Sequence, residues 1–402
     1  MFTFVKYVMF SFVNMKNMQL KELFQEDFYS AIKMQEVTGR YVTNKDLEKV
    51  KSYFGDKIDF QEIGRSVKGK SVYMTRVGKG KIKVLAWSQM HGNEATTTKA
   101  VFDLLNTFIN ESGNKVISSI LDSCSIFIIP ILNPDGAEAY TRINANSVDL
   151  NRDLQQLSQP ESRILMQQYQ AIKPEFCLNL HDQRTIFSAG SRPEPATLSF
   201  LTPSKDPERS IDDSRRQSMC LIAGMAEDLQ NELQGRIGRY DDAFNINCAG
   251  DTFQNLNIPT VLFEAGHFPE DYEREETRKY VFKALLSCLY QIAHLQPDTS
   301  GEESYFDIPE NQKLFNDVII RNARIGNENS EISIQFREVL GEKGIEFLPM
   351  VEKREKRISN YGHREIDAKG LEVSLPDGSE ISENVVVNKI VINNRELEVK
   401  YR

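Results

Sequence analysis

The chain has 402 residues and a formal net charge of -9, with 40% hydrophobic and 27% charged residues. This length predicts two domains, or one large domain with an appendage. The composition excludes a wholly disordered chain and a fibre. The one dense basic run, Lys353 to Arg357, is interrupted by Glu355, and a nucleic-acid binder usually shows a strong basic bias over a whole face. We therefore expect a globular protein that does not bind nucleic acid.

The first fifteen residues, MFTFVKYVMFSFVNM, form an apolar segment. Lys6 interrupts it, no small-x-small cleavage site follows, and it is shorter than the roughly 20 residues of a membrane span. We expect no stable membrane span. A degenerate signal or a misassigned start, with Met15 or Met18 as the true beginning, would account for the segment, and we favour a cytoplasmic protein.

The five cysteines are far apart in the sequence and include no CxxC pair. Four or more spaced cysteines can build a disulfide framework in a small secreted domain, but these stand mostly in apolar runs of a long chain. We expect buried free thiols in a reducing compartment. The five are Cys124, Cys177, Cys220, Cys248 and Cys288.

The amino-terminal part reads as a helical lead-in, assigned to residues 1–40. Apolar residues recur at intervals of three and four in residues 20–35 and again in residues 43–54, the second run behind a Thr-Asn capping signal. Residues 41–298 then alternate between β-rich and helical runs. The predicted strands are residues 71–77, 82–90, 124–132, 176–180 and 259–265, and the predicted helices are residues 97–109, 161–172, 214–233 and 271–295.

Nearly continuous apolar strands that alternate with helices predict an α/β fold, with a mixed, mostly parallel central sheet and helices on both of its faces. Functional sites of such folds gather at the carboxyl ends of the strands. The polar stretch Leu295 to Ser304 contains Pro and Gly and predicts a boundary. Beyond it the helical period largely disappears, so residues 305–402 are predicted to form a smaller β-rich domain, as a sandwich or small barrel.

Two candidate metal ligands stand in the stretch SQMHGNEATTT, where a predicted strand passes into a predicted helix. His91 and Glu94 are three residues apart there, and imidazole and carboxylate are both good zinc ligands. His181 ends another apolar strand, in EFCLNLHDQ, and would reach the same edge of the sheet. Two histidines and one glutamate form the catalytic type of zinc site, which leaves a position open for water or substrate.

Further residues at strand ends supply groups that amide hydrolysis needs. The stretch after residue 133 contains Arg142, Asn151 and Arg152, and an arginine can bind a carboxylate with two hydrogen bonds or stabilise an oxyanion. Glu264 ends the strand PTVLFEA, where a carboxylate can act as general base. The alternative for the arginines is a surface ion pair, and for Glu264 it is capping of the following helix.

In order along the chain, HGNEATTT, NPDGAEAYTR, VDLNRD, LNLHD and LFEAGHF resemble the signature blocks of the zinc carboxypeptidase (metallocarboxypeptidase) family. That family is related to the succinylglutamate desuccinylase and aspartoacylase group. The resemblance covers roughly residues 40 to 295. It implies one zinc ion held by His91, Glu94 and His181, and Glu264 as the base that deprotonates a zinc-activated water.

The same resemblance implies the remaining roles. Arg142 would polarise the scissile carbonyl, Asn151 and Arg152 would bind the terminal carboxylate of the substrate, and Asp149 would orient a zinc-ligating histidine. Tyr240 is the nearest candidate for the mobile tyrosine of the family, although its spacing to Glu264 differs from the family pattern.

Two carboxylates depart from the family pattern, Asp153 after the Asn-Arg pair and Asp182 after the third ligand. They would either favour cationic groups in the substrate or support the metal ligands, and the sequence leaves both open. The segment between His91 and His181 is also short compared with digestive carboxypeptidases, so specificity cannot be carried over from those enzymes.

The leading prediction is a zinc metallocarboxypeptidase, a hydrolase that removes a residue from a peptide with a free carboxylate. The first alternative is a zinc amidohydrolase that acts on an N-acyl amino acid or a cell-wall peptide. The second is a non-catalytic binding protein with the same fold. The β-rich domain contains one histidine, His363, and no convergent motif, so we expect it to serve interaction, with a homodimer as the candidate assembly.

Overall fold

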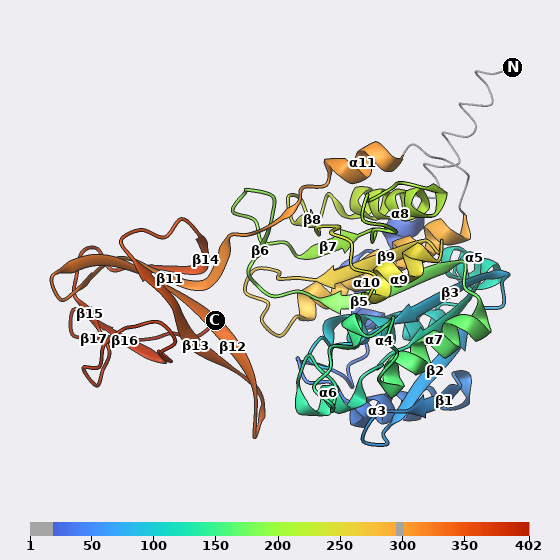
Figure 1. The fold of residues 1–402 in the computed structure, drawn as a ribbon, viewed down its shortest axis with the longest axis horizontal. Coiled ribbons are helices and arrows are strands. Elements are labelled where there is room, and N and C mark those ends of the chain that lie inside the picture. The colour runs from blue at the N-terminus through green and yellow to red at the C-terminus, as the bar shows by residue number, and fades with distance from the viewer. Residues whose placement is uncertain (1–18, 295–300, 402) are drawn as a thin grey trace, which may run out of the picture.

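The computed structural model describes residues 19–294 and 301–401 (Figure 1). The apolar segment at residues 1–15, with both candidate starts, and part of the predicted boundary at residues 295–304 therefore lie outside the described residues. An eight-stranded sheet forms the centre, in the order β1-β2-β4-β3-β5-β9-β7-β8. Its strands are β1 (Phe60–Arg65), β2 (Ser71–Val77), β3 (Ile82–Trp87), β4 (Cys124–Ile129), β5 (Phe176–Asp182), β7 (Leu198–Leu201), β8 (Ile237–Arg239) and β9 (Thr260–Ala265).

Helices cover both faces of this sheet. Successive side chains of a strand point to opposite faces, so the apolar strands place hydrophobic residues on both faces. On β3, Val84 and Ala86 join one hydrophobic core, whereas Leu85 and Trp87 join another. The first core is closed by α2 (Glu26–Ile32), α3 (Asn44–Phe54), α4 (Thr96–Asn110), α5 (Lys115–Ser123), α8 (Asp213–Leu229) and α10 (Glu275–Ala293), and the second by α7 (Pro160–Ile172) and α9 (Ala249–Asn255). The predicted α/β class with a mixed, mostly parallel sheet is confirmed.

The central strands β3, β4, β5 and β9 are all parallel to their neighbours within this group. Their carboxyl ends therefore meet at one edge of the sheet, where sites of open α/β folds form. Strand β3 ends at Trp87, three residues before the predicted end, because the backbone turns at Gln89, whose φ is +48°. That turn leads into His91 and then into α4.

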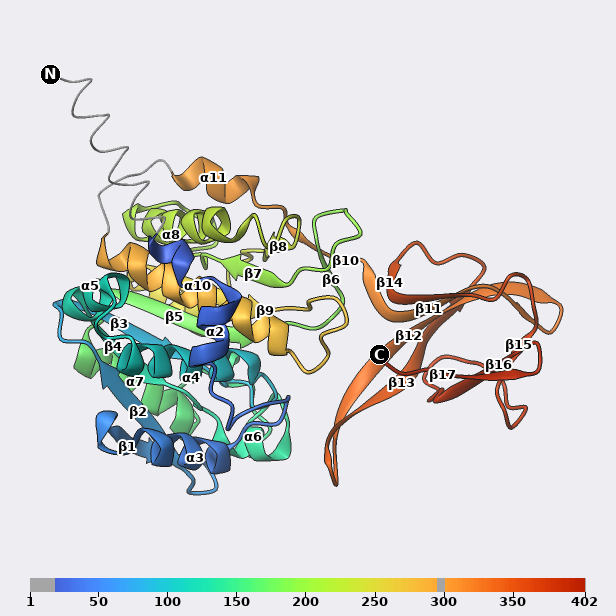
Figure 2. The ribbon, with the colours of Figure 1, turned by 180° about the vertical axis from the view of Figure 1, so that it is seen from behind.

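The β-rich part of the chain forms two further sheets (Figure 2). The four-stranded sheet has the order β13-β12-β11-β14 and the three-stranded sheet β15-β16-β17. One hydrophobic core contains residues of both sheets, among them Val318 of β11 and Ile390 of β16. The strands are β11 (Phe315–Ile325), β12 (Glu328–Gly341), β13 (Gly344–Glu355), β14 (Tyr361–Asp367), β15 (Val373–Ser374), β16 (Lys389–Ile392) and β17 (Arg395–Glu398).

This C-terminal β unit, residues 315–401, is joined to the α/β unit by more than the connecting chain. Helix α11 (Gly301–Asp307) places Tyr305 in the first core of the α/β unit. Strand β10 (Asn311–Lys313) then pairs antiparallel with β6 (Phe187–Ala189). Helix α6 (Pro134–Ala139) lies on the side of the α/β unit that faces the long β12–β13 hairpin.

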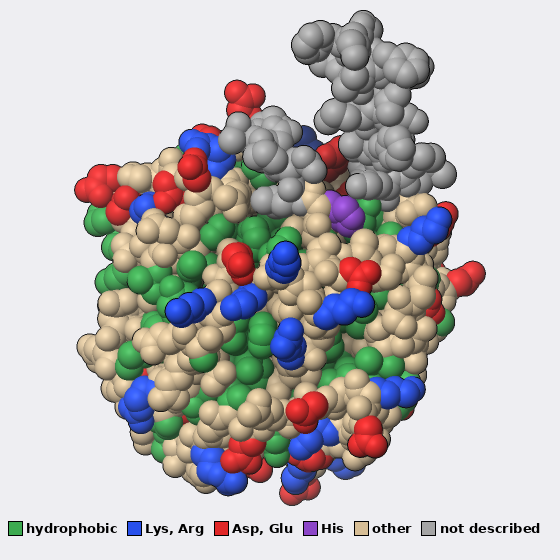
Figure 3. Space-filling model, turned by 90° about the vertical axis from the view of Figure 1, so that its right-hand side faces the viewer, with side chains coloured by type: hydrophobic (Ala, Val, Ile, Leu, Met, Phe, Trp, Pro, Cys, Tyr) green, Lys and Arg blue, Asp and Glu red, His purple; other side chains and the backbone are tan. Residues whose placement is uncertain are grey.

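Figure 3 shows the end of the molecule that faces away from the C-terminal β unit, where α5 and the start of β3 lie. Hydrophobic side chains lie there among scattered Lys and Arg side chains. An open hollow of about 710 Å³ near the amino ends of the strands includes Ile82, Phe176, Pro259 and Ile292 in its lining. None of its lining residues is a predicted site residue. Within the described ranges, no helix combines the length and the hydropathy that crossing a membrane requires.

Candidate functional site

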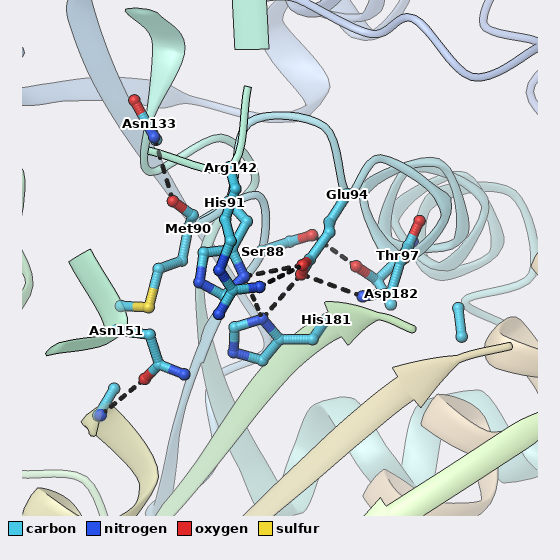
Figure 4. A network of polar contacts seen from close by, with 12 residues as sticks. Ser88, Met90, His91, Glu94, Thr97, Asn133, Arg142, Asn151, His181 and Asp182 are labelled. Atoms are coloured by element: carbon cyan, nitrogen blue, oxygen red, sulfur yellow. Dashed lines mark hydrogen bonds and ion pairs between the residues drawn. The ribbon is translucent and has the colours of Figure 1, made fainter. Parts of the chain in front are cut away.

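The three predicted metal ligands converge at the carboxyl edge of the sheet. His91 and Glu94 lie in the turn between β3 and α4, and His181 lies near the end of β5. All three side chains are buried, and their ligand atoms lie within 4.8 Å of one another. Among the residues that the structure describes, this is the one such group of three or more. Figure 4 shows the two imidazoles and the carboxylate pointing toward one another.

The distances among these atoms describe a compact cluster. Nδ1 of His91 lies 2.8 Å from Oε1 of Glu94, and Nδ1 of His181 lies 2.9 Å from Oε2. The two Nδ1 atoms are 3.2 Å apart. Nε2 of His181 is buried and has no hydrogen-bond partner in the described part of the chain. Two imidazole nitrogens and a carboxylate directed at one point are the donor set of a catalytic zinc site, so these residues fit such an ion.

Local backbone geometry brings the first two ligands to this point. Gly92 lies so close to Gly136 that a Cβ at position 92 would be 1.9 Å from a backbone carbon. The amide of Glu94 donates to the carbonyl of His91, 3.1 Å away, which closes the turn. The side chain of Asn133 caps α6 and also donates to the carbonyl of Met90. Asn133 is not among the site residues predicted from the sequence, because no local pattern marks its contact with Met90.

Asp149 orients the first histidine. Its Oδ1 lies 3.0 Å from Nε2 of His91, which leaves Nδ1 of that ring directed at Glu94. The other oxygen accepts from Nε of Arg142, 3.1 Å away. Burial opposes ionisation of Asp149, but the hydrogen bond and charge of His91, together with Arg142, lower its pKa below the usual range. A carboxylate that holds a ligating imidazole fixes the tautomer and orientation of the ring.

Arg142 reaches the cluster from the loop after α6. Its Nη1 donates to Oε1 of Glu94 at 3.3 Å, and the side chain is 47% exposed. Burial would raise the pKa of Glu94, but the charge of His91 and hydrogen bonds from both histidines lower it below the usual range. The guanidinium thus stands at the border between the buried ligands and solvent, where it can meet a substrate carbonyl.

Asn151 and Arg152 lie on the short 3₁₀ turn Leu150–Arg152. The Asn151 Oδ1 atom accepts from the amide of Ala249 at 2.8 Å, and Figure 4 shows this side chain on the far side of Met90 from Glu94. Arg152 donates to the Asn151 carbonyl at 2.7 Å and lies 3.1 Å from the Cys248 Sγ atom. With its oxygen engaged, the amide of Asn151 offers its NH₂ group as a donor. A carboxylate could be bound by that group together with Arg152.

Glu264 lies on β9 directly beside His181 on β5 in the parallel register. Burial raises its pKa well above the usual value, and the negative charges of Glu94 and Asp182 raise it further.

Tyr240 follows β8, and its ring lies 5.3 Å from that of Phe187. Burial raises the pKa of Tyr240, and the charges of Glu264 and Glu94 add to the shift. Strand β8 runs antiparallel to β9, so Tyr240 follows the end of β8 that lies away from the carboxyl end of β9, and its role stays a prediction.

The two departures from the family pattern have different surroundings. Asp153 accepts from the amides of Ser158 and Gln159 and from the Ser158 hydroxyl, so it stabilises its own loop. Asp182 accepts from the amides of Thr96 and Thr97, and its own amide donates to Glu94. The contacts of Asp182 therefore support the proposed metal ligands. Both Asp153 and Asp182 already accept hydrogen bonds from the protein, so neither is free to bind a cationic group of a substrate.

Comparison with known proteins agrees with this geometry. Residues 43–196 match the family model of zinc carboxypeptidase. This matching segment is similar to the zinc carboxypeptidase family and makes up less than half of the chain. It is 29% identical over 167 residues to "Carboxypeptidase SOL1" of Arabidopsis thaliana, covering 36% of this chain and 34% of the relative. It is 27% identical over 191 residues to "Carboxypeptidase M" of Mus musculus, covering 40% of this chain and 43% of the relative. The matches thus span less than half of these relatives.

Solved structures show the same fold at low sequence identity. Thrombin activatable fibrinolysis inhibitor superposes with a TM-score of 0.51 at 14% identity, covering 68% of this chain and 77% of the other. A metallo-carboxypeptidase from Burkholderia cenocepacia superposes with a TM-score of 0.50 at 17% identity, covering 62% and 69%. The resemblance to the aspartoacylase group stays a prediction.

Proposed function

We propose that the chain is a zinc-dependent carboxypeptidase that hydrolyses the last peptide bond of a peptide with a free carboxylate. The observation that carries this proposal is the buried His91, Glu94 and His181 cluster, next to Glu264 on the neighbouring strand. A zinc ion held by those three residues would supply a Lewis acid that activates water and polarises a carbonyl. One open position would remain for substrate.

The protein groups around the cluster supply the remaining steps. Glu264 is placed to take a proton from the attacking water and to deliver it to the leaving nitrogen. Burial and the negative charges of Glu94 and Asp182 raise the pKa of Glu264, which makes its carboxylate a stronger proton acceptor. Arg142 stabilises the negative charge that develops on the carbonyl oxygen. Asn151 and Arg152 bind the terminal carboxylate and so restrict cleavage to the end of a chain.

The test compares one peptide with a free and with an amidated carboxyl terminus, incubated with zinc-loaded protein. We expect release of the terminal residue from the free peptide alone. Glu264→Gln should retain one zinc per chain and lose turnover by a hundredfold or more, on the order of a general-base contribution. Equal cleavage of both peptides would exclude the carboxypeptidase form, and activity confined to N-acyl amino acids would favour the amidohydrolase.

Metal content tests the ligands separately from turnover. His181→Asn should lose bound zinc, measured by mass spectrometry of dialysed protein. His294→Asn serves as the matched control, because His294 lies at the end of α10, far from the cluster in sequence, and within the described residues its ring bonds the Tyr290 carbonyl. Full zinc content in the His181 variant would contradict the ligand assignment.

A further inference from the structure

The C-terminal β unit contacts two segments that directly follow proposed site residues. Thr185 stands four residues after His181 in the sequence. Its carbonyl accepts from Nε2 of His363 at 2.7 Å, and its hydroxyl accepts from Gln335 at 2.8 Å. His267 stands three residues after Glu264, and its ring lies 4.3 Å from the ring of His363.

A third contact reaches the segment that carries Arg142. Tyr140 follows α6, two residues before this arginine, and its ring lies 6.3 Å from that of Tyr41. The Tyr140 hydroxyl donates to Oε2 of Glu338 on β12. Both oxygens of Glu338 also accept from Nη2 of Arg40, at 2.9 Å each. Arg40 is 6% exposed and Tyr140 is 7% exposed, whereas the side chain of Glu338 is 24% exposed, so the junction lies at the edge of the buried region.

The junction restrains the backbone on which Arg142 depends. Tyr140 has a φ of +52°, a conformation that few non-glycine residues adopt without support. The amide of Thr141 donates to the carbonyl of Gly136 at 2.9 Å, which holds one side of the turn. The phenol of Tyr140 holds the other side. Among the residues that the structure describes, by contrast, the head group of Arg142 has two longer contacts, with Glu94 and Asp149.

We propose that Tyr140 and Glu338 are positioning residues, through which the C-terminal β unit sets the location of Arg142 in the active site. This rests on the proposed function, because Arg142 is the group that would stabilise the oxyanion. The β unit then completes the catalytic geometry, in addition to any part it has in interactions. A carbonyl-polarising group displaced by about 1 Å loses on the order of a hundredfold in rate.

Tyr140→Phe is the sharpest test, since it removes only the hydroxyl and leaves the pair of Arg40 and Glu338 intact. Tyr361→Phe is the matched control. Its hydroxyl also crosses between the two units, to the carbonyl of Ser191 at 3.4 Å, but it does not contact the Arg142 segment. We expect Tyr140→Phe to lower kcat at least tenfold with KM within twofold and zinc content unchanged. Tyr361→Phe should leave kcat within twofold.

A fall in kcat with an unchanged KM indicates the loss of an interaction that is made in the transition state. This result therefore distinguishes a positioning role from general destabilisation. Glu338→Gln provides a second variant, which keeps hydrogen bonding and removes the charge. It should show a smaller fall in kcat than Tyr140→Phe together with a lower thermal midpoint. Equal kcat for Tyr140→Phe and Tyr361→Phe would overturn the proposal.

Hydrogen exchange of residues 134–149 gives a readout independent of turnover. Faster exchange of this segment in Tyr140→Phe than in Tyr361→Phe supports the positioning role, and identical exchange in the two variants overturns it. If the wild-type chain binds zinc but releases no terminal residue, the proposed carboxypeptidase function fails. The exchange measurement still decides whether Glu338 and Tyr140 fix the segment.

Discussion

The carboxylate of Asp182 accepts a hydrogen bond from the backbone amide of Thr96, 2.9 Å away. Thr96 is the first residue of α4, and the preceding residue, Ala95, has no side-chain oxygen with which to cap the helix. The amide of Asp182 in turn donates to Oε2 of Glu94 at 3.2 Å. One residue therefore ties the strand of the third proposed ligand to the helix that follows the first two.

Asp182→Ala should lower both the free energy of unfolding and the affinity for zinc. Loss of a helix cap costs about 1–2 kcal/mol, and release of the Glu94 segment should weaken the metal cluster as well, since partners of ligands typically contribute tenfold or more to affinity. Asn114→Ala is the control, because Asn114 caps α5 through the amide of Val116. Urea unfolding and competitive zinc titration measure the two effects. An equal loss of zinc affinity in both variants would contradict the role of Asp182.

Substitutions of the two arginines near the site, Arg142 and Arg152, should change different steady-state constants. Arg152→Met should raise KM about tenfold to a hundredfold, because a charge-assisted hydrogen bond to the terminal carboxylate contributes about 1.5–3 kcal/mol. Arg142→Met should instead lower kcat, since its charge acts on the developing oxyanion. Arg163→Met is the surface control, because Nη1 of Arg163 donates to the Leu157 and Ser158 carbonyls of the neighbouring loop. A raised KM with unchanged kcat for Arg142→Met would reverse the two assignments.

Long periodic elements of this fold follow from the sequence. Strand β2 occupies the predicted residues 71–77, and α4 begins and ends within one residue of the predicted helix. The short strands β6, β7 and β8 were not predicted, because three or four residues carry too little periodicity to distinguish a strand from a loop. Their pairing depends on neighbours far away in the sequence, such as β10, which bonds to β6.

The candidate site was predictable to the extent that each ligand stands at a strand end. His91, Glu94 and His181 could be placed at one edge of the sheet because parallel strands share that edge. The bond between Asp182 and Thr96, and the one between Tyr140 and Glu338, join residues 86 and 198 positions apart. No local pattern marks such a pair, so only the fold reveals it.

Acid should weaken the protein through the histidine contact between the two units. Burial lowers the pKa of His363 to about 4, and the charges of Arg274 and Arg236 add to the shift. The pKa of His267 is also lowered, mainly by burial and further by the nearby positive charges of His363, Arg274, Arg40 and Arg236. The unfolded chain, with a histidine pKa of about 6.5, then binds more protons than the folded chain between pH 6.5 and 4. The free energy of unfolding must therefore fall as the pH decreases through this window.

The expected size of this effect for His363 is at most about 2 kcal/mol between pH 7 and pH 5. His363→Gln keeps a donor for the Thr185 carbonyl but does not titrate, so it should lose less stability than the wild type over that range. Urea midpoints at the two pH values measure the difference, with His294→Gln as the control. A loss in His363→Gln as large as that of the wild type would show that this histidine does not contribute.

The largest loss of stability should come from a buried ion pair between α4 and α10. Arg278 and Asp103 both have fully buried side chains, with Nη2 and Oδ1 2.6 Å apart and Nε and Oδ2 2.7 Å apart. Asp103 also accepts from the Tyr29 hydroxyl and the Met34 amide. The pair therefore anchors the amino-terminal segment to two helices of the first core.

Asp103→Asn should lower the free energy of unfolding by about 3–5 kcal/mol, because it removes the main anionic partner of a guanidinium that is shielded from water. Glu275, the second carboxylate near Arg278, is already paired with Lys99. The double variant Asp103→Leu with Arg278→Met should lose less than the single variant, since no buried charge remains. Glu396→Gln, which breaks a solvent-exposed pair with Lys389, should cost no more than about 1 kcal/mol. A single Asp103 variant as stable as this surface control, in urea unfolding, would contradict the assignment.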